Sequence, residues 1–203
     1  VSEFGAVISG VLSAAADRSY LAEVRYFDAN EDPGIIAKIG GLFSSQVQGL
    51  ISLMPFDHYP GPELPPDHLP LVFLEEQDLK ATPAVNFDLR HGAYMITRRL
   101  LELGHREIAP CFGPETRHMR RVADLLLEGH SLAMREAGLR VDKEAVGQSM
   151  DIAMGDLAGL NRFLDEHSAS TALLGVSPAR AREIIGLGAM RGVRTPRDLS
   201  LVS

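Results

Sequence analysis

The chain has 203 residues, of which 45% are hydrophobic, and it carries a formal net charge of -7 at pH 7. This size and apolar content can bury the core of one α/β domain or of two small lobes. The acidic balance argues against a free-standing nucleic-acid binder, which normally presents a basic face. No apolar run is long enough to span a bilayer. The one cysteine, Cys111, excludes an intramolecular disulfide and a multi-cysteine zinc site.

Apolar residues recur at helical spacing from Phe4 to Ala15, which predicts an amphipathic helix capped by Ser2. Strand-like and helix-like patterns then alternate to the C-terminus. The predicted strands lie at 22–26, 49–54, 69–74, 84–87, 108–112, 172–176 and 199–202. The further predicted helices lie at 33–43, 93–103, 122–138, 157–163 and 181–190. Because parallel strands need helical connections, this order predicts parallel sheets flanked by helices, as a single sheet or as two Rossmann-like lobes.

His105 stands among charged residues in the stretch RRLLELGHREIA, residues 98–109. Leu103 ends a helical pattern there, and Gly104 can adopt the left-handed conformation that closes a helix. No nucleophile or carboxylate is spaced to His105 by a known catalytic mechanism. The pattern therefore favours a joint between a helix and a strand over a catalytic cluster.

The stretch VNFDLRHGAYMITRRLLELGHREIAPCFGP, residues 85–114, resembles a block of the LacI/GalR family of bacterial transcription regulators. The stretches QVQGLISLMP (46–55), GHSLAMREAGL (129–139) and GVRTPRDLSLVS (192–203) resemble further segments of the same family. This resemblance spans nearly the whole chain. It implies the family's effector-binding and dimerisation core, with a periplasmic-binding-protein type I fold. It further implies an N-terminal lobe at residues 1–88, a C-terminal lobe at residues 89–203, and a small-molecule effector bound between them.

The resemblance also implies partners. Family members carry a helix-turn-helix domain and a hinge helix ahead of this core and continue beyond its last strand, so we expect a core that is incomplete at both ends. DNA contact is then expected only through a domain absent from this chain. A homodimer built through the first two helices, a cytoplasmic location, no membrane, no cofactor and no enzymatic activity complete the expectation.

The family places effector-binding residues at the carboxyl ends of strands and at the starts of helices. Phe4 matches a position where an aromatic ring stacks on the ligand, although it is equally explained as the first core residue of its helix. Glu75 matches an acidic ligand residue of sugar-binding members, and its alternative is a solvated loop charge. Phe87 matches a pocket aromatic, while Asp88 beside it is expected to cap the next helix.

Two positions depart from the family pattern. Leu126 replaces an arginine that clamps the effector in many members, and Arg120 or Arg121 is the candidate to take over that role. Ser177-Pro178 replaces an Asn-Asp pair, and Ser177 becomes the effector candidate there. Losing a forked donor and an amide–carboxylate pair predicts either an effector with fewer hydroxyls or little effector response.

Other chemistries find less support. The chain has no dinucleotide-binding fingerprint after a strand, no phosphate-binding loop and no nucleophile elbow. Asp57-His58 and Asp67-His68 could ligate a metal, but they lie in a proline-rich stretch typical of a solvated loop, and no metal is expected. The stronger rivals are a solute-binding protein of a sugar transporter, which has the same two-lobe fold, and a dimerisation module with a vestigial cleft.

Overall fold

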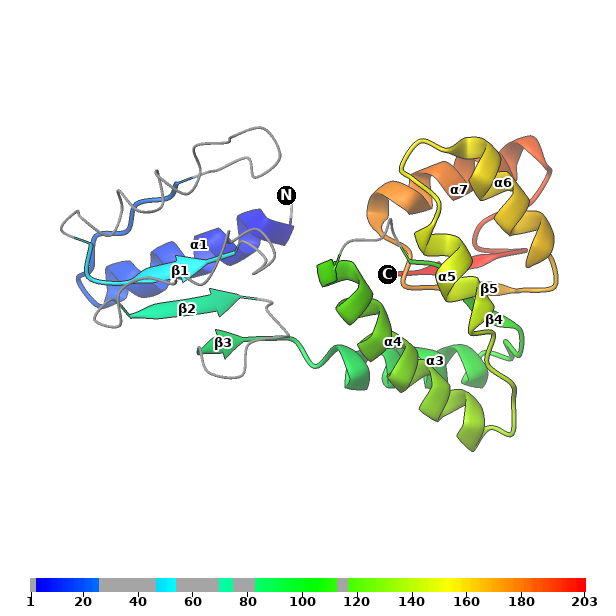
Figure 1. Cartoon of the computed structure of the whole chain (residues 1–203), viewed down its shortest axis with the longest axis horizontal. Coiled ribbons are helices and arrows are strands. Elements are labelled where there is room, and N and C mark those ends of the chain that lie inside the picture. The colour runs from blue at the N-terminus through cyan, green and yellow to red at the C-terminus, as the bar shows by residue number, and fades with distance from the viewer. Residues whose placement is uncertain (1–2, 26–46, 54–69, 75–82, 113–116) are drawn as a thin grey trace. The chain divides into compact units, whose positions relative to one another are not determined.

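The structure, a computed structural model, describes residues 3–25, 47–53, 70–74, 83–112 and 117–203 (Figure 1). The chain divides into two compact units, Val1–Val47 and Gln48–Ser203. In the first unit, α1 (Glu3–Asp17) confirms the predicted amphipathic helix. Residues 22–25 form no strand, and the prediction there is wrong because alternation makes a strand only where the backbone pairs with a neighbour. The helix predicted at 33–43 lies outside the described residues.

The described residues of the second unit form two parallel three-stranded sheets. The first has the order β1-β2-β3, with β1 (Leu50–Ser52), β2 (Leu71–Leu74) and β3 (Ala84–Val85). Phe73 on the central strand is fully buried and pairs in register with Ser52 and Ala84. Each strand occupies part of an apolar run that the sequence assigned to a strand.

The second sheet has the order β4-β5-β6, with β4 (Ile108–Pro110), β5 (Ala172–Leu174) and β6 (Ser200–Val202). Its helices are α3 (Leu89–Glu102), α4 (Arg117–Glu136), α5 (Glu144–Met150), α6 (Leu157–Glu166) and α7 (Pro178–Met190). The helix α5 was not predicted. Asp142 marks its start, because one carboxylate oxygen accepts from the backbone N–H groups of Glu144 and Ala145, each at 3.1 Å.

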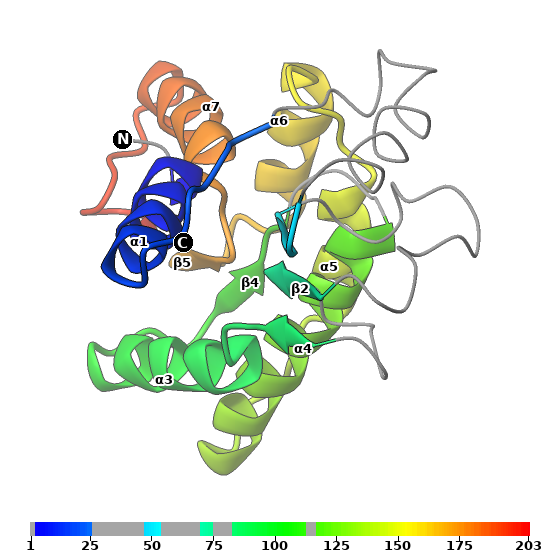
Figure 2. The ribbon, with the colours of Figure 1, turned by 90° about the vertical axis from the view of Figure 1, so that its left-hand side faces the viewer.

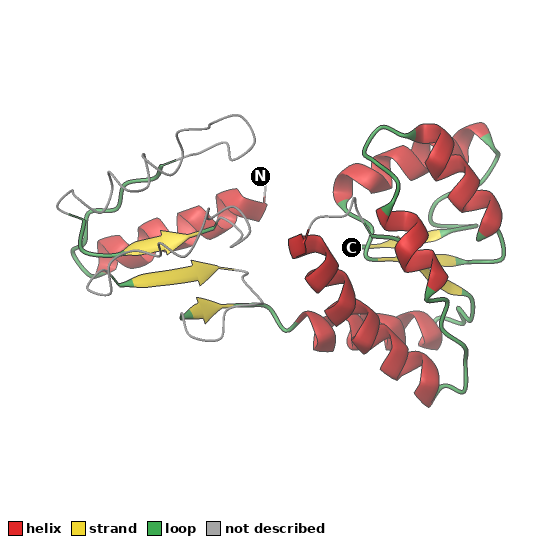
Figure 3. Cartoon of the chain, in the orientation of Figure 1, coloured by secondary structure: helices red, strands yellow, loops and turns green. Residues whose placement is uncertain are grey.

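Helical layers cover both faces of this second sheet (Figure 3). Ile108 of β4 packs with Leu100 and Met134, which come from α3 and α4. The next residue, Ala109, packs on the other face with Phe163 of α6 and Ile184 of α7. Successive strand residues point to opposite faces, so every residue of β4 and β5 is buried. The predicted α/β class with parallel sheets flanked by helices is confirmed.

The joint between α3 and β4 is structural. Asp88 caps α3 by accepting a backbone N–H of the first turn at 2.9 Å, which confirms its predicted role. Gly104, with φ of +96°, closes the helix in the left-handed conformation. The ring of His105 then bonds the hydroxyls of Thr171, at 2.8 Å, and Ser200, at 3.3 Å. The imidazole thus ties together the segments that enter the three strands.

The helices α3 and α4 pack closely against each other (Figure 2). Gly129 makes this approach possible, because a Cβ atom there would overlap the carbonyl oxygen of Arg90 and lie 2.9 Å from the amide nitrogen of Tyr94. The residue after Gly129 is His130, whose buried ring meets the hydroxyl of Thr97 on α3 at 3.0 Å. Burial lowers the pKa of His130 to about 4, so the ring is neutral at pH 7.

Candidate functional site

The carboxyl ends of β4, β5 and β6 meet at one edge of the second sheet, because the strands are parallel. Backbone bonds extend the ladder past the strands: the N–H of Cys111 donates to Leu174 at 2.8 Å, and that of Gly175 donates to Val202 at 2.9 Å. Phe112 follows Cys111 at the end of β4, and Val176 and Ser177 follow Gly175 at the end of β5. We call the set Cys111, Phe112, Gly175, Val176 and Ser177 the carboxyl edge, the place where ligands bind in open parallel α/β sheets.

The carboxyl edge is fixed from below by α5. The backbone N–H of Phe112 donates to the hydroxyl oxygen of Ser149 at 3.1 Å, and that hydroxyl donates to Val146 at 2.9 Å. The ring of Phe112 is buried, and a Cβ atom on Gly175 would overlap it. The backbone at this edge is therefore held in one conformation by buried groups.

The titratable groups at the carboxyl edge do not suit nucleophilic chemistry. Burial raises the pKa of the Cys111 thiol to about 12, so the thiol stays protonated at neutral pH. Arg180 is buried below the edge, and its guanidinium donates to the carbonyl of Ile152 at 2.6 Å and to Glu183 at 2.9 Å. This charge is satisfied within the protein, so its role is structural rather than catalytic.

Two sequence candidates are described in full. Ser177 lies on the carboxyl edge as the N-cap of α7, and its oxygen accepts from the backbone N–H of Arg180 at 3.2 Å. Its hydroxyl proton can still donate to a ligand. Arg121 lies near the start of α4, partly buried, and lines a surface pocket of about 360 Å³ together with Arg90 and Asp124.

The other three candidates are placed less completely. Phe87 precedes the cap of α3, and 64% of it is exposed. Phe4 belongs to the first turn of α1, in the first unit. Glu75 lies outside the described residues, as do the pairs Asp57-His58 and Asp67-His68. Of these candidates, the structure assigns Ser177 to the carboxyl edge, and the effector roles of all five stay predictions.

Leu126 occupies a core position rather than a site. It packs against the buried cluster of Phe112, Ala123 and Met150, which lies next to the carboxyl edge. The arginine expected from the family pattern is thus replaced by a side chain that completes the hydrophobic core.

Sequence reasoning missed Ser149 and Arg180, which position the carboxyl edge. Ser149 is in α5, a helix that the spacing of apolar residues did not predict. Arg180 and Glu183 are three residues apart on one helix, a spacing that indicates an ion pair. Nothing in that spacing distinguishes a buried pair from a surface pair.

Within the described residues, no helix has the length and apolar character needed to cross a membrane. The same residues contain no cluster of three or more His, Cys, Asp or Glu side chains arranged to bind a metal ion.

Comparison with known proteins shows which family the chain belongs to. The model of the periplasmic binding protein-like domain matches residues 97–203, more than half of the chain. The chain belongs to this family. The region that the family model matches contains the whole β4-β5-β6 sheet and its carboxyl edge.

Relatives within the family are transcription regulators. The chain is 26% identical to the ribose operon repressor of Haemophilus influenzae, over 95% of this chain and 62% of the repressor. It is 27% identical to the HTH-type transcriptional repressor PurR of Pasteurella multocida, over 66% of this chain and 40% of PurR. The chain therefore spans about two fifths to three fifths of the length of these relatives.

A solved structure, that of a protein from Burkholderia thailandensis assigned as a ribose operon repressor, has the same fold. It superposes with a TM-score of 0.74 at 27% identity, covering 98% of this chain and 73% of that one. The resemblance to the effector-binding core of LacI/GalR regulators is confirmed, and so is the periplasmic-binding-protein-like fold.

Proposed function

We propose that this chain is the part of a LacI-type transcription regulator that binds a small-molecule effector and dimerises. The effector binds between a lobe at residues 1–88 and a lobe at residues 89–203. Its binding changes the angle between the lobes and so modulates DNA binding by a helix-turn-helix domain of the complete protein. Such a regulator works in the cytoplasm as a homodimer, without a cofactor and without catalysing a reaction.

One observation carries this proposal: the similarity to a ribose operon repressor extends over 95% of the chain, not over the C-terminal sheet alone. A domain that shared only an α/β sheet with regulators would match over that sheet. The HTH-type repressors among the relatives further support a DNA-binding partner domain. The repressor names also favour this proposal over a solute-binding protein of a transporter.

The effector is a sugar or another small metabolite, in line with the ribose repressors among the relatives. Ser177 donates its hydroxyl proton to the ligand at the carboxyl edge. Arg121 supplies a cation, while Phe4 and Phe87 provide aromatic faces and Glu75 accepts hydrogen bonds from hydroxyl groups. A ligand that binds one lobe arrangement better than another shifts the population toward that arrangement.

A thermal-shift screen tests this proposal. The chain is melted in the presence of ribose, other sugars, sugar phosphates, nucleobases and small organic acids. A specific ligand at a hundredfold excess over its dissociation constant stabilises the fold by about 2.7 kcal/mol, which raises the melting temperature. The Phe87→Ala variant is expected to lose this shift while melting like the wild type without ligand. The Ser177→Ala variant is also expected to lose the shift, and it should melt at a lower temperature because it removes the N-cap of α7, which costs about 0.5–2 kcal/mol.

The matched control is Met95→Ala, which truncates another exposed apolar side chain of the second unit. It is expected to keep the ligand shift. If a folded protein gives no shift with any compound, or if Met95→Ala and Phe87→Ala lose the shift equally, the effector proposal is wrong as stated.

A dimerisation module with a vestigial cleft is the second candidate. Leu126 favours it, because the position of a clamping arginine is filled by a leucine packed into the core beside Phe112. This candidate predicts a dimer in sedimentation analysis together with a blank thermal-shift screen.

A further inference from the structure

A histidine at the end of α6 has no part in the proposed function. His167 is the C-cap of that helix, and only 9% of its side chain is exposed. Its ring lies against the buried ring of Phe163, with 4.5 Å between the two ring centres. Packing therefore holds the imidazole in one place, and its two nitrogen atoms face polar groups of other segments.

Both ring nitrogens of His167 meet an oxygen atom. The Nδ1 atom lies 3.0 Å from one carboxylate oxygen of Asp142, in the loop before α5. The Nε2 atom lies 2.6 Å from the side-chain oxygen of Gln148, in α5 itself. A carboxylate and an amide oxygen only accept hydrogen bonds, so this arrangement needs an N–H group at each nitrogen. A protonated ring has two N–H groups, whereas a neutral ring has one.

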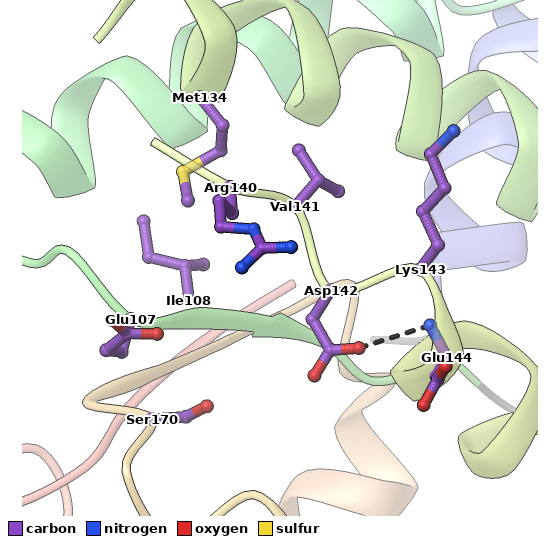
Figure 4. A pocket seen from close by; sticks show the side chains of 9 residues that line it. All are labelled: Glu107, Ile108, Met134, Arg140, Val141, Asp142, Lys143, Glu144 and Ser170. Atoms are coloured by element: carbon purple, nitrogen blue, oxygen red, sulfur yellow. Dashed lines mark hydrogen bonds between the residues drawn. The ribbon is translucent and has the colours of Figure 1, made fainter. Parts of the chain in front are cut away.

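The ring has one charged partner. Asp142 is the only charged residue in ion-pair contact with it among those that the structure describes. The side chain of Lys143 extends away from Asp142 (Figure 4). On α6, Asp165 pairs with Arg191 instead. The other charged residues of these segments are exposed, namely Arg140, Glu144, Arg162 and Glu166. The contacts of the ring therefore change with its own proton rather than with a wider network of charges.

Losing the proton on Nε2 changes the contact with Gln148. The ring then keeps the N–H group that faces Asp142, because a carboxylate has no proton to donate. Its Nε2 atom becomes an acceptor, and two acceptors 2.6 Å apart repel each other. Gln148 must then turn its amide so that the NH2 group donates to the ring. The contact between His167 and α5 thus differs between the two protonation states.

The next residue of α5 connects this contact with the carboxyl edge. Ser149 follows Gln148, and its hydroxyl oxygen accepts the backbone N–H of Phe112 at 3.1 Å. At the other end of α5, the second carboxylate oxygen of Asp142 caps the helix, and Figure 4 shows one of the capping bonds. His167 therefore contacts groups at both ends of the helix that fixes the carboxyl edge.

We propose that His167 is a proton-dependent clamp on α5 that sets the backbone position at the carboxyl edge. With both nitrogens protonated, the ring binds Asp142 and the Gln148 oxygen together. With Nε2 deprotonated, the contact with Gln148 is remade and the bond between Ser149 and Phe112 shifts. Histidine suits such a device because it gains and loses a proton near neutral pH.

In this proposal His167 is a positioning residue, because it acts on the carboxyl edge through α5 and touches no effector. A pH-dependent effector affinity would follow from the clamp. That consequence rests on the proposed function, whereas the clamp itself does not.

A pH titration of the full chain, followed by NMR without any effector, tests the clamp between about pH 5 and pH 8, where histidine changes charge. The carbon-bound ring protons of His167 report its protonation. We expect the backbone amide of Phe112 to shift with the same midpoint as the ring. The side-chain NH2 protons of Gln148 should move downfield as the pH rises, because that group then donates to Nε2.

Two variants separate the clamp from other titrating groups. His167→Gln should abolish the pH-dependent shift of Phe112, because glutamine does not titrate. In Gln148→Met the His167 ring still titrates, but Phe112 should lose its shift, and Gln148 is exposed, so the core is spared. The matched control is His91→Gln, which makes the same substitution at an exposed histidine of α3 and should keep the shift.

A Phe112 amide that stays in place while the His167 ring titrates overturns the proposal. A Phe112 shift of wild-type size in Gln148→Met overturns it as well. Coupled titration alongside a blank effector screen supports the clamp and removes only the proposed function. An effector that binds while the Phe112 amide ignores His167 removes only the clamp.

Discussion

The two helical layers that cover the β4-β5-β6 sheet bury polar groups in opposite ways. The α3–α4 layer buries His130 as a neutral ring, with its Nδ1 atom 3.0 Å from the Thr97 hydroxyl. The α5–α7 layer buries Arg180 as a full charge, with carbonyl oxygens and Glu183 around it. A buried histidine can lose its proton, whereas an arginine cannot. The second layer therefore has to surround a full charge with several acceptors. The first layer holds a neutral ring with a single N–H, and the Nε2 atom of that ring is buried without a hydrogen-bond partner among the described residues.

Replacing Arg180 should break the α5–α7 layer and have the largest effect. The Arg180→Met variant leaves Glu183 and the carbonyl of Ile152 without their donor, and breaking a buried pair in this way costs about 3–5 kcal/mol. The free energy of unfolding in urea measures it. Arg99→Gln, which breaks the exposed pair with Glu102, is the control and should cost much less. Equal losses in the two variants would show that the Arg180 network adds nothing.

Gly129 offers the corresponding way to break the α3–α4 layer. The Gly129→Ala variant puts a Cβ atom onto the carbonyl of Arg90, and this overpacking should cost about 1–3 kcal/mol in unfolding free energy. Gly92→Ala on the facing helix is the matched control, because nothing lies within 4 Å of its added Cβ. That control should stabilise the protein by about 0.5–1 kcal/mol through helix propensity. If both variants change stability in the same direction, close helix packing is not what Gly129 permits.

The pH dependence of stability tests whether the α3–α4 layer buries His130 as a neutral ring. Burial lowers its pKa from 6.5 to about 4, so between these values the unfolded chain binds more protons and stability falls as the pH falls. Going from pH 7 to pH 5 should cost the wild type about 2 kcal/mol through this group. His130→Gln cannot titrate, so its unfolding free energy should depend less on pH by that amount. Parallel pH profiles for the two proteins would contradict a buried neutral histidine.

Much of the fold follows from local pattern. The apolar runs around residues 50, 72, 109, 173 and 201 all became strands, because each is short, is rich in branched or long apolar residues and is bounded by polar or turn-forming residues. The stretch at 22–25 did not, since alternation cannot show whether a neighbouring strand exists. The helix α5 was not predicted, because its seven residues are too few for apolar positions to repeat at helical spacing.

In the candidate site, less could be predicted from the sequence than in the fold. The resemblance to the family placed Ser177 just after a predicted strand, and the structure has it there as the N-cap of α7, while its effector role stays a prediction. The burial of Arg180 and the packing of Leu126 against the core beside the carboxyl edge could not be predicted, since both depend on which elements pack together. A surface pocket of about 400 Å³ at the opposite edge of the same sheet was equally hidden, because it combines Glu107, Arg140 and Ser170 from three separate segments.

The sequence by itself determined the alternation of strands and helices, the cap at Asp88, the left-handed turn at Gly104 and the similarity to LacI-type regulators. These features depend on residues close together in the chain, where spacing and side-chain chemistry act directly. Only the tertiary structure decided that His130 is buried as a neutral ring, that Arg180 is buried with acceptors around its charge, and where the surface pockets lie. Those properties arise from desolvation and from partners contributed by distant segments, and a linear pattern contains neither.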